Sequence, residues 1–374
     1  MTEAHTIGMD TLARPVLPRT GASRSAGMPA RVMICDDSLA IRGAIARILE
    51  ADPEIEVVAR VGNGRAAVEA LKRNHADVVV LDIEMPILDG MAALPLLLRV
   101  DPKVRVIMAS TLTTRGADIA LRALRLGAAD YVPKPGSAAA ASGDFARELV
   151  AKVKGLARLR PGGRPATATP PPLTSRPAPL LAPRLLAIGS STGGPQALFT
   201  LFQGLDRGLR VPVVVTQHMP PTFIPLLADH LNRLGQIPCA EAKDGEPLLP
   251  GRAYLAAGDR HLLIQSTGTG LHCRLTLDPP ENFCRPAVDP MLRSAAIACD
   301  GRVLVAMLTG MGHDGLEGTR AVVQAGGCAI GQDEATSIVW GMPGAIAQAG
   351  LCHAVLPLPA MAPKLLELLK GGRA

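Results

Sequence analysis

A proline-rich segment, residues 161–183, divides this chain more sharply than any other feature of its sequence. It reads PGGRPATATPPPLTSRPAPLLAP and holds eight prolines, with almost no large apolar residue before Leu180. Such a stretch cannot form a packed core and favours extended, polyproline-like backbone. We therefore predict a disordered tail, two folded domains and a linker between them, at residues 1–30, 31–155, 184–370 and 156–183 respectively.

The composition is that of a globular protein. The 374 residues are 48% hydrophobic and 19% charged, a balance typical of folded domains. No apolar run approaches the roughly 18 residues that a membrane helix needs, and the N-terminal residues lack the apolar segment of a secretory signal. We therefore expect a cytoplasmic protein without membrane insertion.

Cysteine spacing and charge narrow the class of protein further. The seven cysteines form no C-x-x-C pair, which argues against a disulfide framework or a zinc site, and we expect most of them to be buried, inert thiols. The net charge is +6, but aromatic residues make up only 2% of the chain. Because stacking platforms for bases are nearly absent, we expect no nucleic-acid partner.

Before the linker, five apolar strands alternate with five helical stretches. This rhythm predicts an α/β domain with a doubly wound, five-stranded parallel sheet. The expected strands are Val32–Cys35, Val57–Val61, Val78–Leu81, Val104–Ala109 and Tyr131–Val132.

After the linker the same alternation resumes and is then interrupted by shorter strands. We expect these at Ala253–Ala256, Leu262–Gln265 and Leu271–Leu277. The pattern predicts a second α/β domain, with a mostly parallel sheet and an antiparallel insertion.

Polar side chains stand at successive strand ends of the first domain. Asp36 and Asp37 follow its first strand, Asp82 ends the third, Ser110 ends the fourth and Lys134 follows the fifth. Strand ends of a parallel sheet meet at one edge, so three carboxylates would converge there. They would repel one another unless a cation compensates, and Mg²⁺ suits such oxygen ligands. A lone aspartate at such a place is more often a loop former or a helix cap.

The motifs CDDS, VLDIEMPILDG, MAST and VPKP resemble those of response-regulator receiver domains. This resemblance implies that Asp82 accepts a phosphoryl group. It further implies that Asp36, Asp37, Asp82 and the Glu84 backbone carbonyl hold Mg²⁺, directly or through water. Ser110 and Lys134 would then be the switch residues.

In the second domain, a glycine-rich turn follows the first strand. Gly189–Gly194 reads GSSTGG, which fits either a phosphate-binding loop or a nucleophile turn of the type G-x-S-x-G around Ser191. His218 ends the next apolar strand, and Asp314 follows the strand VLVAML. A serine nucleophile needs such a base and such an acid. A single histidine or aspartate at a strand end is more often structural.

The motifs IGSSTGGPQAL, VVTQHMPPTFIPLLADHLN and LTGMGHDGLEG resemble the catalytic domain of the chemotaxis protein-glutamate methylesterase (CheB) family. The resemblance implies Ser191 as nucleophile, His218 as base and Asp314 as orienting acid. It assigns an oxyanion donor to the Met311 backbone, with Thr192 assisting. His313 departs from the family pattern, and we expect it to be a surface substitution.

Together the two resemblances imply an esterase that is activated by phosphorylation. It would hydrolyse glutamate γ-methyl esters on chemoreceptor cytoplasmic domains, release methanol and deamidate specific receptor glutamines. A histidine kinase would supply the phosphoryl group, and the hydrolase domain would need no cofactor. Two alternatives stay open: a non-catalytic binding module, or the same hydrolase acting on another substrate.

Overall fold

The computed structural model describes residues 28–110, 113–134, 143–158, 181–206 and 208–370. The predicted tail lies almost wholly outside these residues, as does most of the predicted linker. Among the described residues, no helix is long and apolar enough to cross a membrane.

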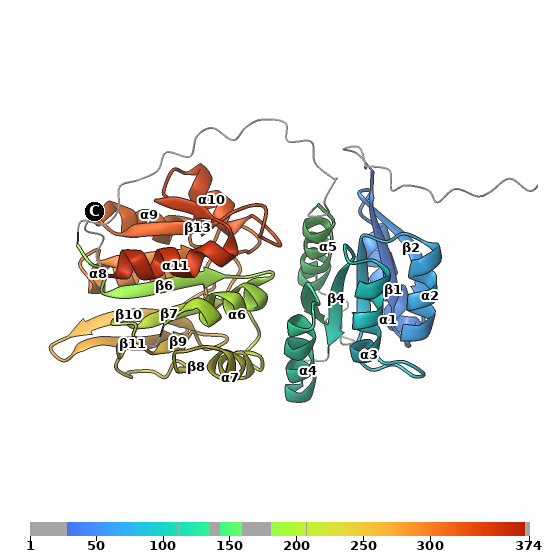
Figure 1. The fold of residues 1–374 in the computed structure, drawn as a ribbon, viewed down its shortest axis with the longest axis horizontal. Helices are drawn as coiled ribbons and strands as arrows, with labels where there is room; N and C mark the ends of the chain where they lie inside the picture. The colour runs from blue at the N-terminus through green and yellow to red at the C-terminus, as the bar shows by residue number, and fades with distance from the viewer. Residues whose placement is uncertain (1–27, 111–112, 135–142, 159–180, 207, 371–374) are drawn as a thin grey trace, which may run out of the picture.

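The first unit is a parallel sheet between two layers of helices (Figure 1). Its strand order is β2-β1-β3-β4-β5. The strands are β1 (Ala30–Cys35), β2 (Ile55–Val61), β3 (Val78–Asp82), β4 (Arg105–Ser110) and β5 (Asp130–Pro133). The helices are α1 (Leu39–Glu50), α2 (Gly64–Arg73), α3 (Gly90–Val100), α4 (Thr114–Arg125) and α5 (Gly143–Arg158).

Local sequence explains these elements. All five residues of β3 are buried, as expected for a central strand covered on both faces. Helices α1 to α4 each begin after a capping side chain that accepts a backbone N–H bond, from Ser38, Asn63, Asp89 and Thr113 respectively. The strand ends therefore lead into helices at a fixed edge of the sheet.

The second unit has a seven-stranded sheet in the order β14-β13-β12-β6-β7-β9-β8, with every pair parallel. Its strands are β6 (Leu185–Ser190), β7 (Val213–Gln217), β8 (Cys239–Glu241), β9 (Ala253–Leu255), β12 (Val303–Met307), β13 (Cys328–Gln332) and β14 (Ala354–Leu356). The hairpin β10 (His261–Thr267) and β11 (Gly270–Thr276) forms a separate antiparallel sheet. The predicted fold class is thereby confirmed, although Ala253–Leu255 belongs to the main sheet and not to the insertion.

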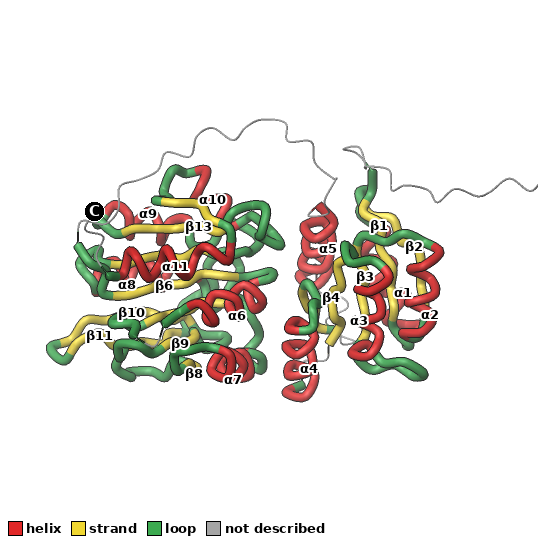
Figure 2. Tube along the Cα trace, viewed as in Figure 1, coloured by secondary structure: helices red, strands yellow, loops and turns green. Residues whose placement is uncertain are grey.

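Helices cover both faces of this sheet, as Figure 2 shows. They are α6 (Gly194–Gly204), α7 (Ile224–Leu234), α8 (Val288–Ala298), α9 (Leu316–Gln324), α10 (Met342–Gln348) and α11 (Leu358–Leu369). Leu186 and Ile188 of β6 share a core with α6, α7 and α11, whereas Leu185 and Ala187 pack with α8 and the hairpin. Successive side chains of β6 therefore point to opposite faces of the sheet, and both faces are buried.

The two units share an apolar core. Tyr131 of β5 stacks on Phe223, just before α7, with ring centroids 4.5 Å apart. A single cluster of buried side chains runs from the β3–β4 region of the first unit into α6 and α7 of the second. In Figure 1, α4 and α5 lie on the side of the first unit that faces α6 and α7.

Candidate functional site

Three carboxylates meet at the strand-end edge of the first unit. One ligand oxygen from each of Asp36, Asp37 and Asp82 lies within 4.8 Å of the others. Asp36 and Asp82 are buried, and Asp37 is exposed. Lys134 Nζ lies 2.6 Å from Asp82 Oδ1 and 3.5 Å from Asp36 Oδ2. The parallel sheet thus brings together residues that are 98 positions apart in the chain, from Asp36 to Lys134.

These residues fit a divalent cation. Asp82 Oδ2 is buried and has no hydrogen-bond partner among the described residues. Burial of such an oxygen is costly unless a cation or another ligand binds it. Burial raises the pKa of Asp82 to about 6, although Lys134 opposes that rise. Hard oxygen ligands at such spacing are those that Mg²⁺ prefers. Glu84 donates its backbone N–H to Asp82 Oδ1 at 3.2 Å.

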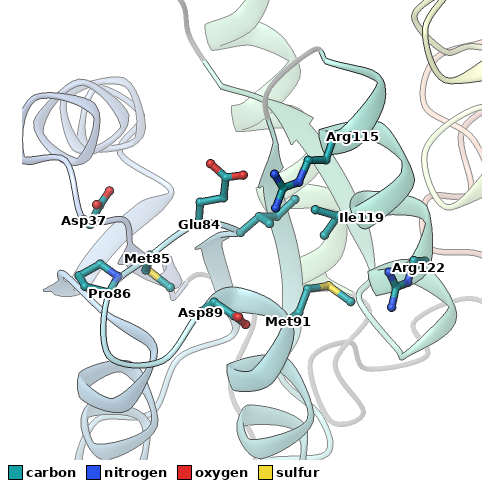
Figure 3. A pocket seen from close by; sticks show the side chains of 10 residues that line it. Asp37, Glu84, Met85, Pro86, Asp89, Met91, Arg115, Ile119 and Arg122 are labelled. Carbon is teal, nitrogen blue, oxygen red and sulfur yellow. The ribbon is translucent and has the colours of Figure 1, made fainter.

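A pocket of about 640 Å³ opens beside this cluster. Asp37, Glu84 and Met85 line one side of it, and Arg115 and Arg122 of α4 line the other (Figure 3). Ser110 is buried at the end of β4, where its carbonyl accepts the Lys134 backbone N–H at 2.7 Å. Lys134 therefore contacts the carboxylate cluster directly, and Ser110 is joined to Lys134 through its backbone.

In the second unit, the ends of β12, β6 and β7 lie next to one another. Ser190 pairs with Gln217 in the sheet register, and the His218 backbone N–H donates to Ser190 O at 3.1 Å. Ser191 follows directly and turns into α6 through Gly193, whose φ of 74° suits glycine. The sequence motifs for a nucleophile and a base are thus adjacent in space.

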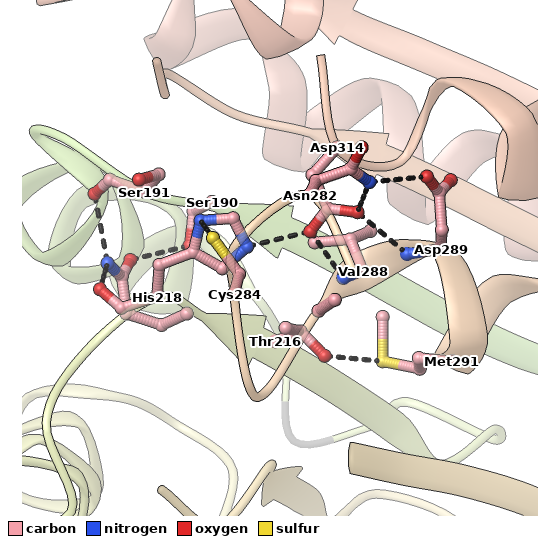
Figure 4. Close-up of polar contacts among 12 residues, drawn as sticks. Ser190, Ser191, Thr216, His218, Asn282, Cys284, Val288, Asp289, Met291 and Asp314 are labelled. Carbon is pink, nitrogen blue, oxygen red and sulfur yellow. Dashed lines mark hydrogen bonds and ion pairs between the residues drawn. The ribbon is translucent and has the colours of Figure 1, made fainter. Parts of the chain in front are cut away.

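A hydrogen bond joins the predicted base and acid. His218 Nε2 lies 2.7 Å from Asp314 Oδ2 (Figure 4). The same oxygen accepts the Val288 N–H at 2.6 Å, and Oδ1 accepts the Asp289 N–H at 3.1 Å. Burial would raise the pKa of Asp314, but these bonds and His218 outweigh it and hold the pKa below its ordinary value. The carboxylate is therefore ionised and fixed in orientation.

The second ring nitrogen of His218 faces a thiol. Cys284 Sγ lies 3.4 Å from His218 Nδ1, and the described residues form no hydrogen bond between the Ser191 hydroxyl and this ring. Burial lowers the pKa of His218, but Asp314 and Cys284 reverse the shift and raise it to about 10. The contacts with Asp314 and Cys284 therefore favour the protonated form of the ring in this arrangement.

Cys284 is half-buried, unlike the six other cysteines, which are buried. The expectation that most of the thiols are buried therefore holds, but sequence reasoning missed the part that Cys284 plays. Its position in an irregular segment, outside the strand ends, gave no signal of this contact.

Two further residues flank the serine. Gly310 lies so close that an added Cβ would be 2.9 Å from Ser191 Cβ, so only glycine fits there. The next residue, Met311, has a backbone N–H that enters no hydrogen bond within the described residues. Thr192 is buried beside Ser191, and its carbonyl accepts Thr309 Oγ1 at 3.0 Å. His313 is exposed, as expected for a surface substitution.

The first unit packs against the surroundings of Ser191. Gln196 of α6 donates its side-chain amide to the Leu124 carbonyl at 2.8 Å and to the Ala128 carbonyl. His230 of α7 lies 3.2 Å from Asp118 of α4. These contacts hold α4 against the two helices that follow Ser191 and His218.

Two residues of the second unit, Ile338 and Phe283, also contact α5. Ile338, which packs on Gly193 of the serine turn, also joins the core formed by α5. Arg147 of α5 lies over the Phe283 ring at 5.9 Å. The first unit therefore packs against Ile338 and Phe283 as well as against α6 and α7.

The fold and its two clusters define a class of protein: a phospho-acceptor domain packed on an α/β hydrolase domain. The chain matches the family models for the response regulator receiver domain at residues 32–141 and for CheB methylesterase at residues 186–365. A protein-glutamate methylesterase/protein-glutamine glutaminase of Azospirillum brasilense is 54% identical, over 95% of this chain and 97% of that protein. A second, from a group 2 operon of Rhodospirillum centenum, is 56% identical over 91% and 94%.

A solved structure, the CheB methylesterase catalytic domain of Thermotoga maritima, is 38% identical, covers 50% of this chain and 100% of its own, and has a TM-score of 0.49. The chain belongs to the protein-glutamate methylesterase/protein-glutamine glutaminase family, with an N-terminal response-regulator receiver domain and a C-terminal CheB catalytic domain.

Proposed function

We propose that this chain hydrolyses glutamate γ-methyl esters on the cytoplasmic domains of chemoreceptors, with release of methanol, and deamidates specific receptor glutamines. Ser191 is the nucleophile, His218 the general base and Asp314 the acid that orients the base. The observation that carries the proposal is the 2.7 Å bond between His218 and Asp314, at the same sheet edge as Ser191. A cytoplasmic location is part of the proposal.

The reaction proceeds in two steps, acylation of Ser191 and hydrolysis of the acyl-serine. Ser191 Oγ attacks the ester carbonyl while His218 takes the hydroxyl proton, and the tetrahedral intermediate collapses as His218 returns that proton to the departing methanol. Water then attacks the acyl-serine while His218 takes a proton from it, and His218 returns that proton to Ser191 Oγ as the receptor's glutamate side chain is released. The negative oxygen of each intermediate accepts hydrogen bonds from the Met311 N–H and from Thr192, a contribution worth about 10²–10³-fold per donor.

Phosphorylation of Asp82 regulates this site. A histidine kinase of the chemotaxis type donates the phosphoryl group, and Asp36, Asp37, Asp82 and the Glu84 carbonyl would hold Mg²⁺. The cation would neutralise charge on the carboxylates and on the phosphoryl oxygens. Ser110 and Lys134 then bond to the phosphoryl group, which draws Lys134 away from its 2.6 Å contact with Asp82.

The resting enzyme is inhibited in two ways. The receiver domain packs on α6 and α7 beside the serine turn, and Cys284 occupies the ring nitrogen of His218 that Ser191 needs. Rearrangement of the α4 and α5 surface on phosphorylation loosens this packing. Ser191 can then replace Cys284 as the partner of His218.

The decisive experiment measures methanol release from a methylated chemoreceptor fragment by the full chain, with and without Mg²⁺ and acetyl phosphate. We expect slow release that the phosphodonor accelerates. If the chain releases methanol from a small methyl ester but not from the receptor fragment, it is an esterase and the proposed chemoreceptor substrate is wrong. If it cleaves no ester under any condition, the second domain is a binding module.

A further inference from the structure

A tight turn lies directly against the His218–Asp314 pair. Glu281 and Cys284 exchange two backbone hydrogen bonds, of 3.1 and 2.8 Å, and enclose Asn282 and Phe283. Both enclosed residues have positive φ, 51° and 62°. Asparagine tolerates this conformation, but phenylalanine rarely adopts it. Strained backbone persists where its surroundings require it.

The turn directs one side-chain amide at two buried carboxylates. Asn282 Nδ2 donates to Asp314 Oδ1 and to Asp289 Oδ2, each at 3.0 Å (Figure 4). Asn282 is otherwise exposed, whereas Asp289 and Asp314 are only 4% and 2% exposed. The amide therefore contributes little to the core but reaches the acid of the proposed triad.

All other bonds to the two carboxylates come from backbone N–H groups or from His218. Asp314 accepts from Val288 and Asp289, and Asp289 Oδ1 accepts from Gly318 at 2.6 Å. Burial, together with the charge of Asp314, raises the pKa of Asp289. Asn282 is the only side-chain amide among the described residues that separates these two like charges.

We propose that Asn282 is a positioning residue for the reaction: its amide holds the Asp314 carboxylate in the plane that aligns His218 with Ser191, and uses Asp289 as its second anchor. The inference rests on the proposed function. Asp289 is thereby assigned the role of a fixed support and not that of an acid or base.

Two substitutions separate the amide from the backbone turn. Asn282→Gly removes the amide and suits the positive φ, whereas Asn282→Asp keeps the shape and replaces the donor with a third carboxylate. We expect kcat for methanol release to fall about 10-fold in the first and about 100-fold in the second, with KM within about twofold of the wild type. The aspartate variant is the more severe because it adds repulsion to the lost bond.

The pH profile distinguishes positioning from a structural role. Loss of the amide dipole favours protonation of the pair, so the acidic limb of kcat/KM should move to higher pH, further for Asn282→Asp. The other groups that face the pair, Asp289, Arg293 and Cys284, are unchanged in both variants. Asn232→Asp is the matched control, because Asn232 lies exposed on α7 and its side chain bonds, among the described residues, only the Cys239 N–H.

The measurements use the full chain, with thermal unfolding followed in parallel. Unchanged kcat and an unchanged pH profile in both Asn282 variants would overturn the positioning role, as would losses that match a lower folded fraction. An inactive wild-type chain instead contradicts the proposed function itself. Partial recovery of kcat when Asp289→Asn is added to Asn282→Asp, which returns an amide to the cluster, supports the proposal.

Discussion

Two neighbouring serines in the β6–α6 turn have opposite surroundings. Ser190 is fully buried, and its hydroxyl donates to Gln217 Oε1 at 2.7 Å. Ser191 is half-buried at the sheet edge, and its backbone carbonyl accepts the Gln217 amide at 2.9 Å. The Ser190 hydroxyl is thus buried and hydrogen-bonded, whereas the Ser191 hydroxyl is the one of the two that can attack a substrate.

We predict that Ser191→Ala reduces the turnover of methyl ester by about 10⁴-fold or more, because the acyl-enzyme can no longer form. Ser190→Ala is the control. It should reduce turnover less than about tenfold, and it should lower stability by about 1 kcal/mol through the lost hydrogen bond. Methanol release and thermal unfolding measure the two effects. Equal losses of turnover in both variants would contradict the assignment of the nucleophile.

Cys284 gives a second prediction at this scale. Its thiol occupies His218 Nδ1 at 3.4 Å and contributes to the raised pKa of that ring. In Cys284→Ala, the pKa of His218 should fall, so the acidic limb of kcat/KM should move to lower pH. Basal turnover should rise by up to about fivefold, since about 1 kcal/mol of competing hydrogen bond is removed. The direction is opposite to that expected for Asn282 variants.

The check is a pH series of methanol release without phosphodonor. Cys273→Ala is the control, because that thiol is buried in the hairpin β10–β11 and, within the described part of the chain, forms no hydrogen bond with Ser191, His218 or Asp314. A tenfold fall in the turnover of Cys284→Ala would show that the thiol supports the base and does not compete for it.

Residues at strand ends could be predicted from the sequence, and those in the 281–286 turn could not. Ser191, His218 and Asp314 each follow a long apolar run, so the parallel sheet fixes where they meet. Asn282 and Cys284 lie in an irregular turn between the hairpin and α8, and its positive-φ backbone leaves no periodic pattern. Their contacts with the pair depend on tertiary packing alone.

At the scale of elements, length decided what could be predicted. The strands β1, β3, β6, β7 and β12 are apolar runs of five or six residues, which periodicity identifies well. The three-residue strands β8 and β14 were not predicted, because so short a segment carries no period. The same limit explains why β9 could not be assigned to the main sheet.

Helix α6 links the serine turn to the receiver domain. It begins at Gly194, three residues after Ser191, and presents Gln196 to two backbone carbonyls of the receiver. A helix that starts at the nucleophile and is bonded to the regulatory domain can transmit a change in domain packing to the catalytic turn. The sequence could not indicate this, since nothing distinguishes Gln196 from Thr200 and Gln203, the other polar side chains of this helix.

We predict that Gln196→Ala raises basal turnover by up to about tenfold, because two hydrogen bonds of about 0.5–1.5 kcal/mol each no longer hold the domains together. Thr200→Ala, on the same helix, is the control: Thr200 is exposed and bonds only the Gln196 carbonyl. Methanol release without phosphodonor measures the effect. No increase in Gln196→Ala would show that this contact does not restrain the enzyme.

At the scale of the molecule, the receiver surface formed by α4, β5 and α5 is in contact with the catalytic domain. Tyr131, Asp118 and Arg147 come from these elements and meet Phe223, His230 and Phe283. The pocket beside the carboxylate cluster is lined by Asp37 and, from α4, by Arg115 and Arg122. Helix α4 therefore borders both the phosphorylation site and the domain interface.

We predict that acetyl phosphate and Mg²⁺ no longer accelerate methanol release by Asp82→Asn, because an amide cannot accept the phosphoryl group. The nearby Asp89→Asn should still respond, since Asp89 lines the pocket but caps α3 and belongs to no carboxylate cluster. Dose-response curves for the phosphodonor compare the two variants. Activation that persists in Asp82→Asn would place the acceptor elsewhere.

The ring stack between Tyr131 and Phe223 has a thermal consequence. Separating the domains would bring these rings and their buried neighbours into contact with water, which carries a positive heat-capacity change. Apolar association weakens on cooling, so the separated form should gain population in the cold. In an organism that grows at low temperature, an enzyme with this interface would have a higher basal activity without phosphorylation, unless polar contacts such as those of Gln196 held the domains together.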